Sequence, residues 1–423
     1  MSVTLRAVLA ALALVSVACS GASRAPAASD DDLTPDLPDL EPARESAGTL
    51  KHRCDDGALD ACVELGRRHL VGDGIPRDRD QAVALWTRAC DGGDGGGCAE
   101  LGNLDLADED DAKAVARGLG RLEKGCGMKS GYACFRWGRV AQDGLLTKRD
   151  LPAAAKRYGL GCDLGSADAC HALGELHQDG DGVKKDLAKA AALQKKACDL
   201  GARWCAWYGY HLEHGLGVRA DVRAAATHYD RACDAGDMIG CHHLAELAQR
   251  GDGVRQDPAK AARLFERACD AGTVASCGSL GRAYQEGAGV PADPAKGLAL
   301  TQRGCDGGDA VSCGNLGVTW ERGIGVRADA AKAAGFYRKG CEMGSPAACV
   351  FLGIMHGTGA GGVARDPKAA ATLFEAACEG GYGIGCAYAA NAYGEGAGVK
   401  KDLGKARELT RRACELGVAE ACE

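Results

Sequence analysis

The feature that most constrains the fold of this chain is a regular series of paired cysteines. From residue 54 onwards, 22 of its 23 cysteines fall into eleven pairs, ten with seven intervening residues and one with six. The first cysteines of successive pairs recur every 36 residues, with one step of 35 and one of 37. A period of this size predicts stacked supersecondary units rather than separate globular domains. The pairs are Cys54 with Cys62, Cys90 with Cys98, Cys126 with Cys134, Cys162 with Cys170, Cys198 with Cys205, Cys233 with Cys241, Cys269 with Cys277, Cys305 with Cys313, Cys341 with Cys349, Cys378 with Cys386 and Cys414 with Cys422.

Each period contains two predicted helices. Residues 186–198 form an alanine-rich amphipathic stretch that predicts a helix, here called helix B. An aspartate twelve residues before the first cysteine is typical of its N-cap. A second helix, helix A, is expected around the second cysteine and ends at Gly-x-Gly, where glycine supplies the positive φ that closes a helix. The aspartate recurs in nine repeats, as Asp78, Asp150, Asp186, Asp221, Asp257, Asp293, Asp329, Asp366 and Asp402.

The two cysteines of a pair flank the short turn from helix B to the next helix A. Closing this nine-residue loop with a disulfide is worth about 2.5 kcal/mol in the chain-entropy model. Pairing between neighbouring repeats is disfavoured, because packed helices lie about 8–10 Å apart and bridged Cα atoms within about 7 Å. The chain contains no Cys-x-x-Cys, and histidine does not recur with the period. We therefore predict structural disulfides in an oxidising compartment, and no catalytic residue, metal ligand or cofactor.

The N-terminus has the layout of an export signal. Residues 1–18 join a basic residue, an apolar run and a small residue, directly before Cys19. This resembles a bacterial lipoprotein signal, which implies a lipid on Cys19, although Ser16 stands where that family usually has Leu. The alternative is ordinary cleavage of a soluble secreted protein. Ser20 in place of Asp implies an outer-membrane rather than an inner-membrane lipoprotein, facing the periplasm or the surface.

Residues 19–44 are rich in Ala, Ser, Pro and Asp, with too little apolar area to repay ordering. They predict a flexible acidic tether, followed by the repeat solenoid over residues 45–423. A net charge of −7 argues against nucleic acid as the partner, since phosphate binding needs a basic surface. No later segment is long and apolar enough to span a bilayer, so membrane contact is expected through the N-terminal lipid only.

Helix A carries the pattern Leu-Gly-x-x-Tyr/His/Trp, followed by Gly-x-Gly-Val and then Asp-x-x-Lys-Ala. This pattern resembles the Sel1-like repeat, a relative of the tetratricopeptide repeat. The paired cysteines are similar to those of its cysteine-rich secreted bacterial subgroup, in which each repeat carries a disulfide. Good copies are Leu173-Gly174 with His177, Leu280-Gly281 with Tyr284, and Leu316-Gly317 with Trp320.

The resemblance implies an all-α fold, an α/α right-handed superhelical solenoid of about ten 36-residue disulfide-stapled repeats. It also implies that rows of A helices line a concave surface that binds a protein or peptide, which in the cell envelope includes peptidoglycan-associated partners. Two places depart from the pattern. Residues 103–113 lack Gly-x-Gly-Val, and Ala389-Ala390 stand where Leu-Gly is expected.

Some cysteine-rich relatives carry β-lactamase or penicillin-binding descriptions, so a β-lactam-binding or peptidoglycan-processing activity is the alternative function. No serine in the chain has lysine three residues later, and Gly-x-Ser-x-Gly and His-Glu-x-x-His are absent. The sequence therefore favours a binding protein over an enzyme.

Other polar residues have structural interpretations. His69, His177 and His356 occupy the same helix A position as Tyr284, Trp320 and Tyr393, which predicts a packing role. Two histidine pairs, His211 with His214 and His242 with His243, could gather a metal, but solvated histidines are the favoured interpretation. The acidic run Asp105, Asp108, Glu109, Asp110 and Asp111 lacks the glycine and closing glutamate of an EF-hand, so a solvated loop is expected.

The best functional signal is variation inside a fixed framework. Helix A positions two and five residues after the second cysteine share one helical face and differ from copy to copy. Near the single shortened turn, Trp207 and Tyr210 predict partner contacts, whereas Trp204 and Tyr208 predict core filling. The candidate partner-binding residues are Arg136, Trp207, Tyr210, His243, Phe351 and Tyr388.

Overall fold

The computed structural model describes residues 45–107, 111–144 and 148–422, and these residues form helices and turns without a β-strand. The A helices are α3 (Leu59–Val71), α5 (Gly95–Leu106), α7 (Gly131–Asp143), α9 (Ala167–Asp179), α11 (Cys205–His214), α13 (Met238–Arg250), α15 (Val274–Glu286), α17 (Ala310–Arg322), α19 (Pro346–Thr358) and α21 (Gly383–Glu395). The B helices are α2 (Ala47–Asp55), α4 (Arg79–Asp91), α6 (Ala112–Gly127), α8 (Leu151–Asp163), α10 (Leu187–Leu200), α12 (Val222–Asp234), α14 (Pro258–Asp270), α16 (Pro294–Asp306), α18 (Ala330–Glu342), α20 (Pro367–Glu379) and α22 (Leu403–Glu415).

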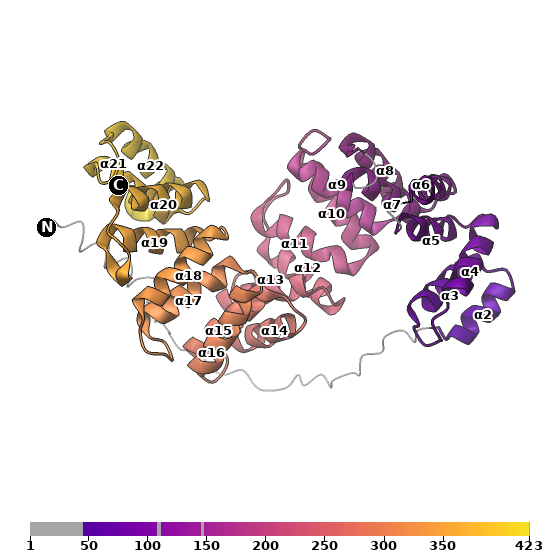
Figure 1. Cartoon of the computed structure of the whole chain (residues 1–423), viewed down its shortest axis with the longest axis horizontal. Coiled ribbons are helices and arrows are strands. Elements are labelled where there is room, and N and C mark those ends of the chain that lie inside the picture. The colour runs from indigo at the N-terminus through magenta and orange to yellow at the C-terminus, as the bar shows by residue number, and fades with distance from the viewer. Residues whose placement is uncertain (1–44, 108–110, 145–147, 423) are drawn as a thin grey trace. The chain divides into compact units, whose positions relative to one another are not determined.

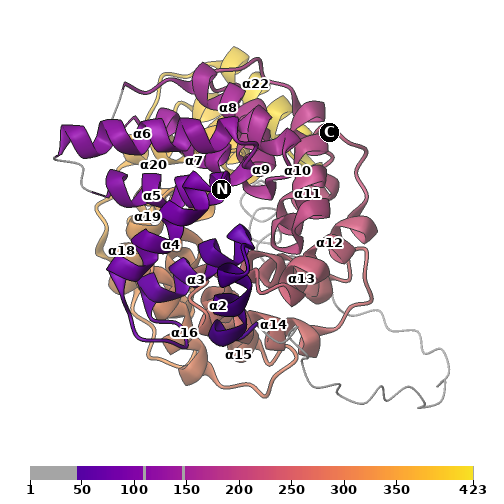
Figure 2. The ribbon, with the colours of Figure 1, turned by 90° about the vertical axis from the view of Figure 1, so that its right-hand side faces the viewer.

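Each A helix packs against the B helix before it and the B helix after it, so neighbours in the chain are neighbours in space (Figure 1 and Figure 2). A helices of consecutive repeats also approach one another, as α5 does α7 and α15 does α17. Short 3₁₀ turns lie at Ala202–Trp204, Ala360–Gly362 and Ala419–Ala421. The predicted fold class, an all-α solenoid of disulfide-stapled repeats, is confirmed.

A disulfide joins the two cysteines of every repeat, and no bond in the described residues crosses from one pair to another. The Cα–Cα distances run from 4.3 Å in the pair with the shortened turn to 4.9 Å in the last pair. Most of the bonded cysteines are buried in the core. The bonds are Cys54 with Cys62, Cys90 with Cys98, Cys126 with Cys134, Cys162 with Cys170, Cys198 with Cys205, Cys233 with Cys241, Cys269 with Cys277, Cys305 with Cys313, Cys341 with Cys349, Cys378 with Cys386, and Cys414 with Cys422.

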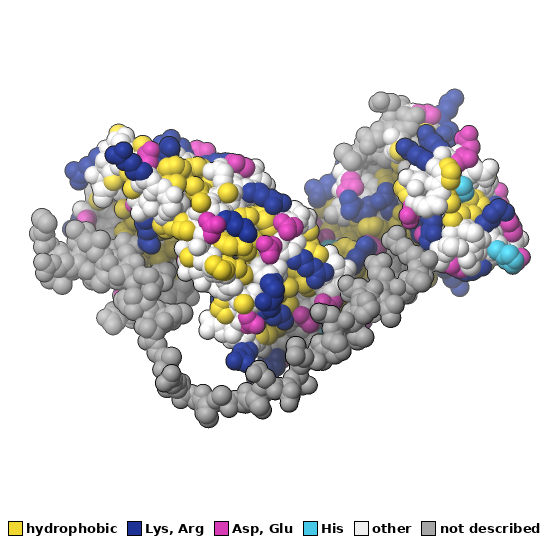
Figure 3. Space-filling view, turned by 90° about the horizontal axis from the view of Figure 1, so that it is seen from below, with side chains coloured by type: hydrophobic (Ala, Val, Ile, Leu, Met, Phe, Trp, Pro, Cys, Tyr) yellow, Lys and Arg dark blue, Asp and Glu magenta, His cyan; other side chains and the backbone are white. Residues whose placement is uncertain are grey.

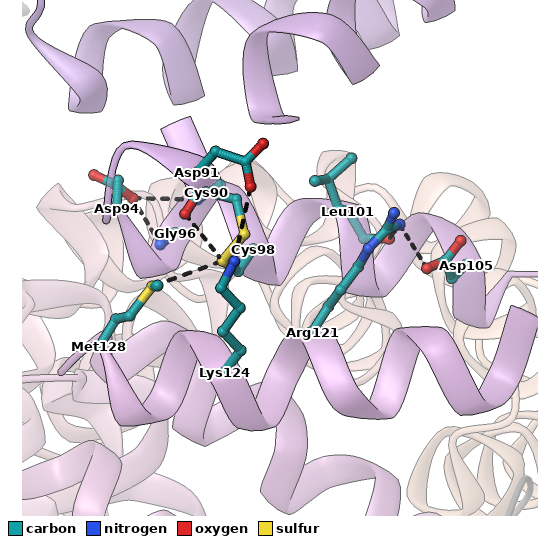
Figure 4. The surroundings of a disulfide bond; sticks show 11 residues. Cys90, Asp91, Asp94, Gly96, Cys98, Leu101, Asp105, Arg121, Lys124 and Met128 are labelled. Atoms are coloured by element: carbon teal, nitrogen blue, oxygen red, sulfur yellow. Dashed lines mark hydrogen bonds and ion pairs between the residues drawn. A yellow bond between two sulfur atoms is a disulfide. The ribbon is translucent and has the colours of Figure 1, made fainter. Parts of the chain in front are cut away.

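Figure 4 shows one of these bonds, in which Cys90 at the end of α4 is joined to Cys98 in the first turns of α5. Each bond thus closes the turn from a B helix to the next A helix. The last bond differs in its surroundings, because Cys422 is exposed and follows a 3₁₀ turn instead of lying in an A helix.

Side chains cap the helices at fixed places in the repeat. All nine predicted aspartates accept a hydrogen bond from a first-turn amide of a B helix. Asp111 caps α6 in the same way, but it stands outside the predicted spacing because α6 is sixteen residues long. Most A helices begin about three residues before the second cysteine, earlier than the cysteine pattern indicated, because a serine or aspartate caps them there, as Ser166 caps α9. Glycines in the left-handed conformation end the A helices other than α5, for example Gly180 and Gly323.

The glycine of the Leu-Gly pair lets helix B approach helix A closely. A Cβ atom on Gly317 would come within 2.3 Å of the ring of Tyr337, and one on Gly66 within 2.5 Å of the ring of Trp86. Both rings are at most 1% exposed and come from the same position of helix B, four residues before the first cysteine. In these hairpins the core is therefore one large ring packed on a glycine, whereas Gln194 and Thr301 hold the ring position in α10 and α16.

We predict that Gly317→Ala lowers the free energy of unfolding by about 1–2 kcal/mol, because the added methyl must displace the buried Tyr337 ring. That ring is held by a 2.7 Å hydrogen bond from its hydroxyl to Glu321. The matched control is Gly335→Ala on α18, where a Cβ atom meets nothing within 4 Å and which should stabilise the helix by about 0.5–1 kcal/mol. Chemical denaturation of both variants checks this, and equal effects would contradict it.

We also predict that removing one buried disulfide by Cys269→Ala with Cys277→Ala lowers the free energy of unfolding by about 2.5 kcal/mol, through the loss of loop closure in the unfolded chain. The measurement is denaturant unfolding followed by circular dichroism. Fragments linked between different repeats in an unreduced digest of the unmutated protein would contradict the pairing.

Candidate functional site

The A helices carry one row of side chains whose identity changes from repeat to repeat. These side chains stand two residues before, two residues after and five residues after the second cysteine, so spacings of four and three residues place them on one helix face. We call this row the A face; in α3 its members are Asp60, Glu64 and Arg67. The position two residues before the cysteine was missed by the sequence analysis, although its variation from Asp60 to Val311 is visible in the sequence.

At its N-terminal end the A face is polar and joined across repeats. Arg67 Nε donates to Glu100 Oε1 at 2.6 Å, and Arg136 Nε donates to Asn103 Oδ1 at 2.7 Å. The amide of Asn103 also donates to the Tyr132 hydroxyl at 3.0 Å. Each bond links neighbouring A helices. Arg136, a predicted contact residue, is therefore held by its neighbour and only partly available to a partner.

Aromatic side chains gather near the shortened turn. The His171 ring stacks on Trp204 with centroids 4.2 Å apart and lies 5.0 Å from Trp207. Tyr210 lies one helical turn further on, 4.2 Å from the ring of His214. Trp204, Trp207 and Tyr210 are all half-buried. The structure thus places Trp207 and Tyr210 together on the A face. Trp204 and Trp207 both contact the ring of His171.

The cluster continues into the next repeat. The His243 ring stacks on the buried Tyr229 at 5.0 Å and lies 6.3 Å from Tyr210. Glu246 lies within 3.4 Å of His243 and 3.7 Å of His242. Burial would raise the pKa of Glu246, but its contact with His243 and the neighbouring positive charges bring the pKa below the ordinary value. Burial lowers the pKa of His242.

Towards the C-terminus the A face is apolar. Phe351 stacks on Tyr337 at 5.0 Å, and Tyr388 stacks on Phe374 at 4.9 Å, so one face of each predicted contact ring is covered by the core. Three aliphatic side chains two residues before the cysteine are exposed, Ile239 by 44%, Val311 by 60% and Ile384 by 37%. The A face therefore changes from charged in α3–α7, through aromatic in α11–α13, to mainly apolar in α17–α21.

The two candidate histidine pairs do not form a ligand group in the described residues. The only set of three potential ligands there is Cys198, Cys205 and His228, whose two sulfurs are bonded to each other. His228 Nδ1 lies 3.4 Å from Cys198 Sγ, and its ring meets the edge of Tyr208, which supports core filling by that tyrosine. The paired histidines contact other groups: His211 with Leu216 O at 2.8 Å, His214 with Tyr210 O at 3.1 Å, and His242 with Ser276 Oγ at 2.8 Å.

The histidines that share a position with aromatic residues face the turn from helix A to helix B. His177 is 7% exposed and contacts Lys184 O at 3.2 Å. The aromatic residues at this position each carry a lysine ammonium 4.1 Å from the ring centre: Tyr284 with Lys296, Trp320 with Lys332, and Tyr393 with Lys405.

The acidic run differs from the expected solvated loop. Asp105 lies in α5, only 14% exposed, and pairs with Arg121 at 2.6 Å (Figure 4). Asp111 is the N-cap of α6. Asp105 has a partner because α6 packs along α5, and Asp111 accepts from the Lys113 amide of α6 itself. Residues 108–110 lie outside the described residues, as do Cys19 and the rest of residues 1–44.

None of the helices in the described ranges combines the length and the apolar character that a bilayer span requires. Positive and negative side chains are interspersed with apolar ones on the surface seen in Figure 3. The disulfides are consistent with an exported protein.

The family model for the Sel1 repeat matches more than half of the chain, in residues 59–94, 131–166, 167–201, 205–237, 239–273, 274–309, 310–345, 346–382 and 384–418. The unmatched stretch between residues 94 and 131 holds α5 and α6, where the sequence departs from the repeat pattern. No curated protein matches this chain.

Two solved structures share the fold. One is c5321, a protective antigen of uropathogenic Escherichia coli with an SLR fold, which is 26% identical with a TM-score of 0.56, over 89% of this chain and 80% of that one. The other is a Sel1 repeat protein from Oxalobacter formigenes, 21% identical with a TM-score of 0.52, over 57% of this chain and 97% of that one.

The low pKa of His242 predicts a pH-dependent stability. Because burial makes the folded state bind this proton more weakly, the unfolded state is protonated first as the pH falls below about 6.5. His242→Asn should therefore lose less thermal stability than the unmutated protein between pH 7.5 and 5.5. Melting curves at both pH values check this, and equal losses would contradict it.

Proposed function

The chain belongs to the Sel1 repeat family, and we propose that it is an envelope-tethered scaffold that binds a protein or peptide along its A face. Sel1 solenoids are generally protein-interaction scaffolds. The observation that carries the proposal is the contrast between a framework of repeated caps, glycines and disulfides and a row of side chains that differs in every repeat.

The aromatic cluster is the proposed anchor of the partner. Trp207, Tyr210 and His243 lie on consecutive A helices and are half-buried, so they can add contact area without a large loss of conformational freedom. The charged end would then orient the partner, because exposed charges contribute more to specificity and association rate than to affinity. The apolar end, with Val311 and Ile384, would extend the contact.

The proposed tether rests on the sequence alone. The signal-like residues 1–18, a lipid on Cys19 and the acidic residues that follow would hold the solenoid at the outer membrane. The disulfides favour the same compartment, since they persist outside the reducing cytosol. This proposal needs no cofactor, and its mechanism is binding rather than catalysis.

We predict that Trp207→Ala with Tyr210→Ala reduces recovery of the partner at least tenfold when the tagged full chain captures proteins from detergent-solubilised envelopes. The matched control is Leu200→Ala with Leu416→Ala, which removes two exposed apolar side chains outside the A face. Melting curves must first show that both variants are folded. Equal recovery of every interactor by the two baits would count against the A face.

A further inference from the structure

A ladder of lysine–carboxylate pairs links consecutive B helices. The lysine of each pair stands three residues after the N-cap aspartate of its B helix. The acid lies on the preceding B helix, three residues before the cysteine of that helix. The distances are 3.9 Å for Lys260–Asp230, 4.0 Å for Lys296–Glu266 and 2.6 Å for Lys405–Glu375. The spacing is thus a property of the repeat and does not depend on one local accident of packing.

The lysine of α18 has no such acid opposite it. Lys332 holds the lysine position, but Gln302 stands where the acid is expected on α16. Gln302 instead donates its amide to Asp306 Oδ2 at 2.9 Å. In residues 45–107, 111–144 and 148–422, no carboxylate lies within salt-bridge distance of the Lys332 ammonium. Its charge therefore lacks the counter-ion that Lys260, Lys296 and Lys405 have.

Lys332 also lacks a second partner. Lys296 and Lys405 each donate to the hydroxyl of the tyrosine beneath them at 2.6 Å. Beneath Lys332 is Trp320, which has no hydroxyl, and the ammonium lies over its ring at 4.1 Å. Lys332 is exposed, so it can reach a carboxylate supplied from outside.

A cleft opens beside this lysine. It is a shallow, open depression of about 450 Å³ lined by Trp320, Lys332, Gly335, Phe336 and Lys339; we call it the α18 cleft. Its lining is mostly apolar, with the rings of Trp320 and Phe336 half-buried. Gly335 leaves it open, because a Cβ atom there would meet nothing within 4 Å.

The chemistry of the cleft defines its ligand. An apolar floor suits an aliphatic or aromatic side chain, and an unpaired ammonium at the rim suits a carboxylate next to it. The second rim lysine, Lys339, is already paired with Asp306 at 3.2 Å. The Lys332 ammonium is therefore the cation of the cleft that can pair with one carboxylate of a ligand. These requirements are met by a peptide in which an acidic residue adjoins a large apolar one.

We propose that the α18 cleft binds an acidic, apolar peptide segment of a partner protein. The apolar side chain would rest on Trp320 and Phe336, and the neighbouring carboxylate would pair with Lys332. This goes beyond the proposed function, since none of the lining residues belongs to the A face.

The test uses a short fluorescein-labelled Gly/Ser peptide with a central Phe-Asp, titrated with the full chain and followed by fluorescence anisotropy. Lys332→Gln should weaken binding about tenfold, as expected for loss of one ion pair at a partly desolvated rim. Gly335→Leu, which fills the cleft, should weaken it by at least the same factor. Replacing Asp by Asn in the peptide should lower its affinity for the unmutated chain by the same factor as Lys332→Gln lowers the affinity for the Phe-Asp peptide.

Two controls keep the test specific. Lys260→Gln changes the equivalent lysine of another repeat, and Trp207→Ala with Tyr210→Ala changes the A face; both should bind the peptide like the unmutated protein. Absence of saturable binding to the unmutated chain, or equal losses for Lys332→Gln and Lys260→Gln, would overturn the proposal. A second result would also overturn it. In that result Lys332→Gln lowers the cosedimentation of the protein with anionic phosphatidylglycerol vesicles but leaves its affinity for the peptide unchanged.

Discussion

The disulfide across each turn from a B helix to the next A helix is the interaction on which the rest of the structure depends. A repeat of 36 residues buries little apolar surface by itself, because its core holds few large side chains, such as the Tyr337 ring that packs on Gly317. The disulfide in each repeat offsets this weakness, because it restricts the conformations that the unfolded chain can adopt. The bonds also fix where each A helix begins relative to the B helix before it.

This division of labour explains why the A face can vary. Caps, glycines and cysteines hold the hairpin from inside, so the three outward positions on each A helix carry few structural duties. Where one of these side chains does form a structural contact, it bonds to a neighbouring repeat, as in the hydrogen bond between Arg136 and Asn103. Phe351 and Tyr388 show the intermediate case, with one ring face on the core and the other turned outward.

The α18 cleft arises from the same repetition. A position that holds an acid in four other B helices holds Gln302 in α16, and the aromatic residue that is tyrosine in two other repeats is Trp320. Each change alone is conservative, but together they leave Lys332 without a carboxylate or a hydroxyl. A regular framework makes such an exception visible, because the equivalent residues in other repeats show what is missing.

The sequence by itself determined the repeat, the two helices, the aspartate caps and the fold class, because these depend on spacings along the chain. Trp207 and Tyr210 could be placed on one helix face for the same reason. Only the tertiary structure decided that Arg136 is held by Asn103, that Asp105 belongs to α5 and that Lys332 lacks a counter-ion, since each depends on residues brought together from different helices. Helical periodicity is local, whereas the distance between two side chains in neighbouring repeats is set by how closely the hairpins pack.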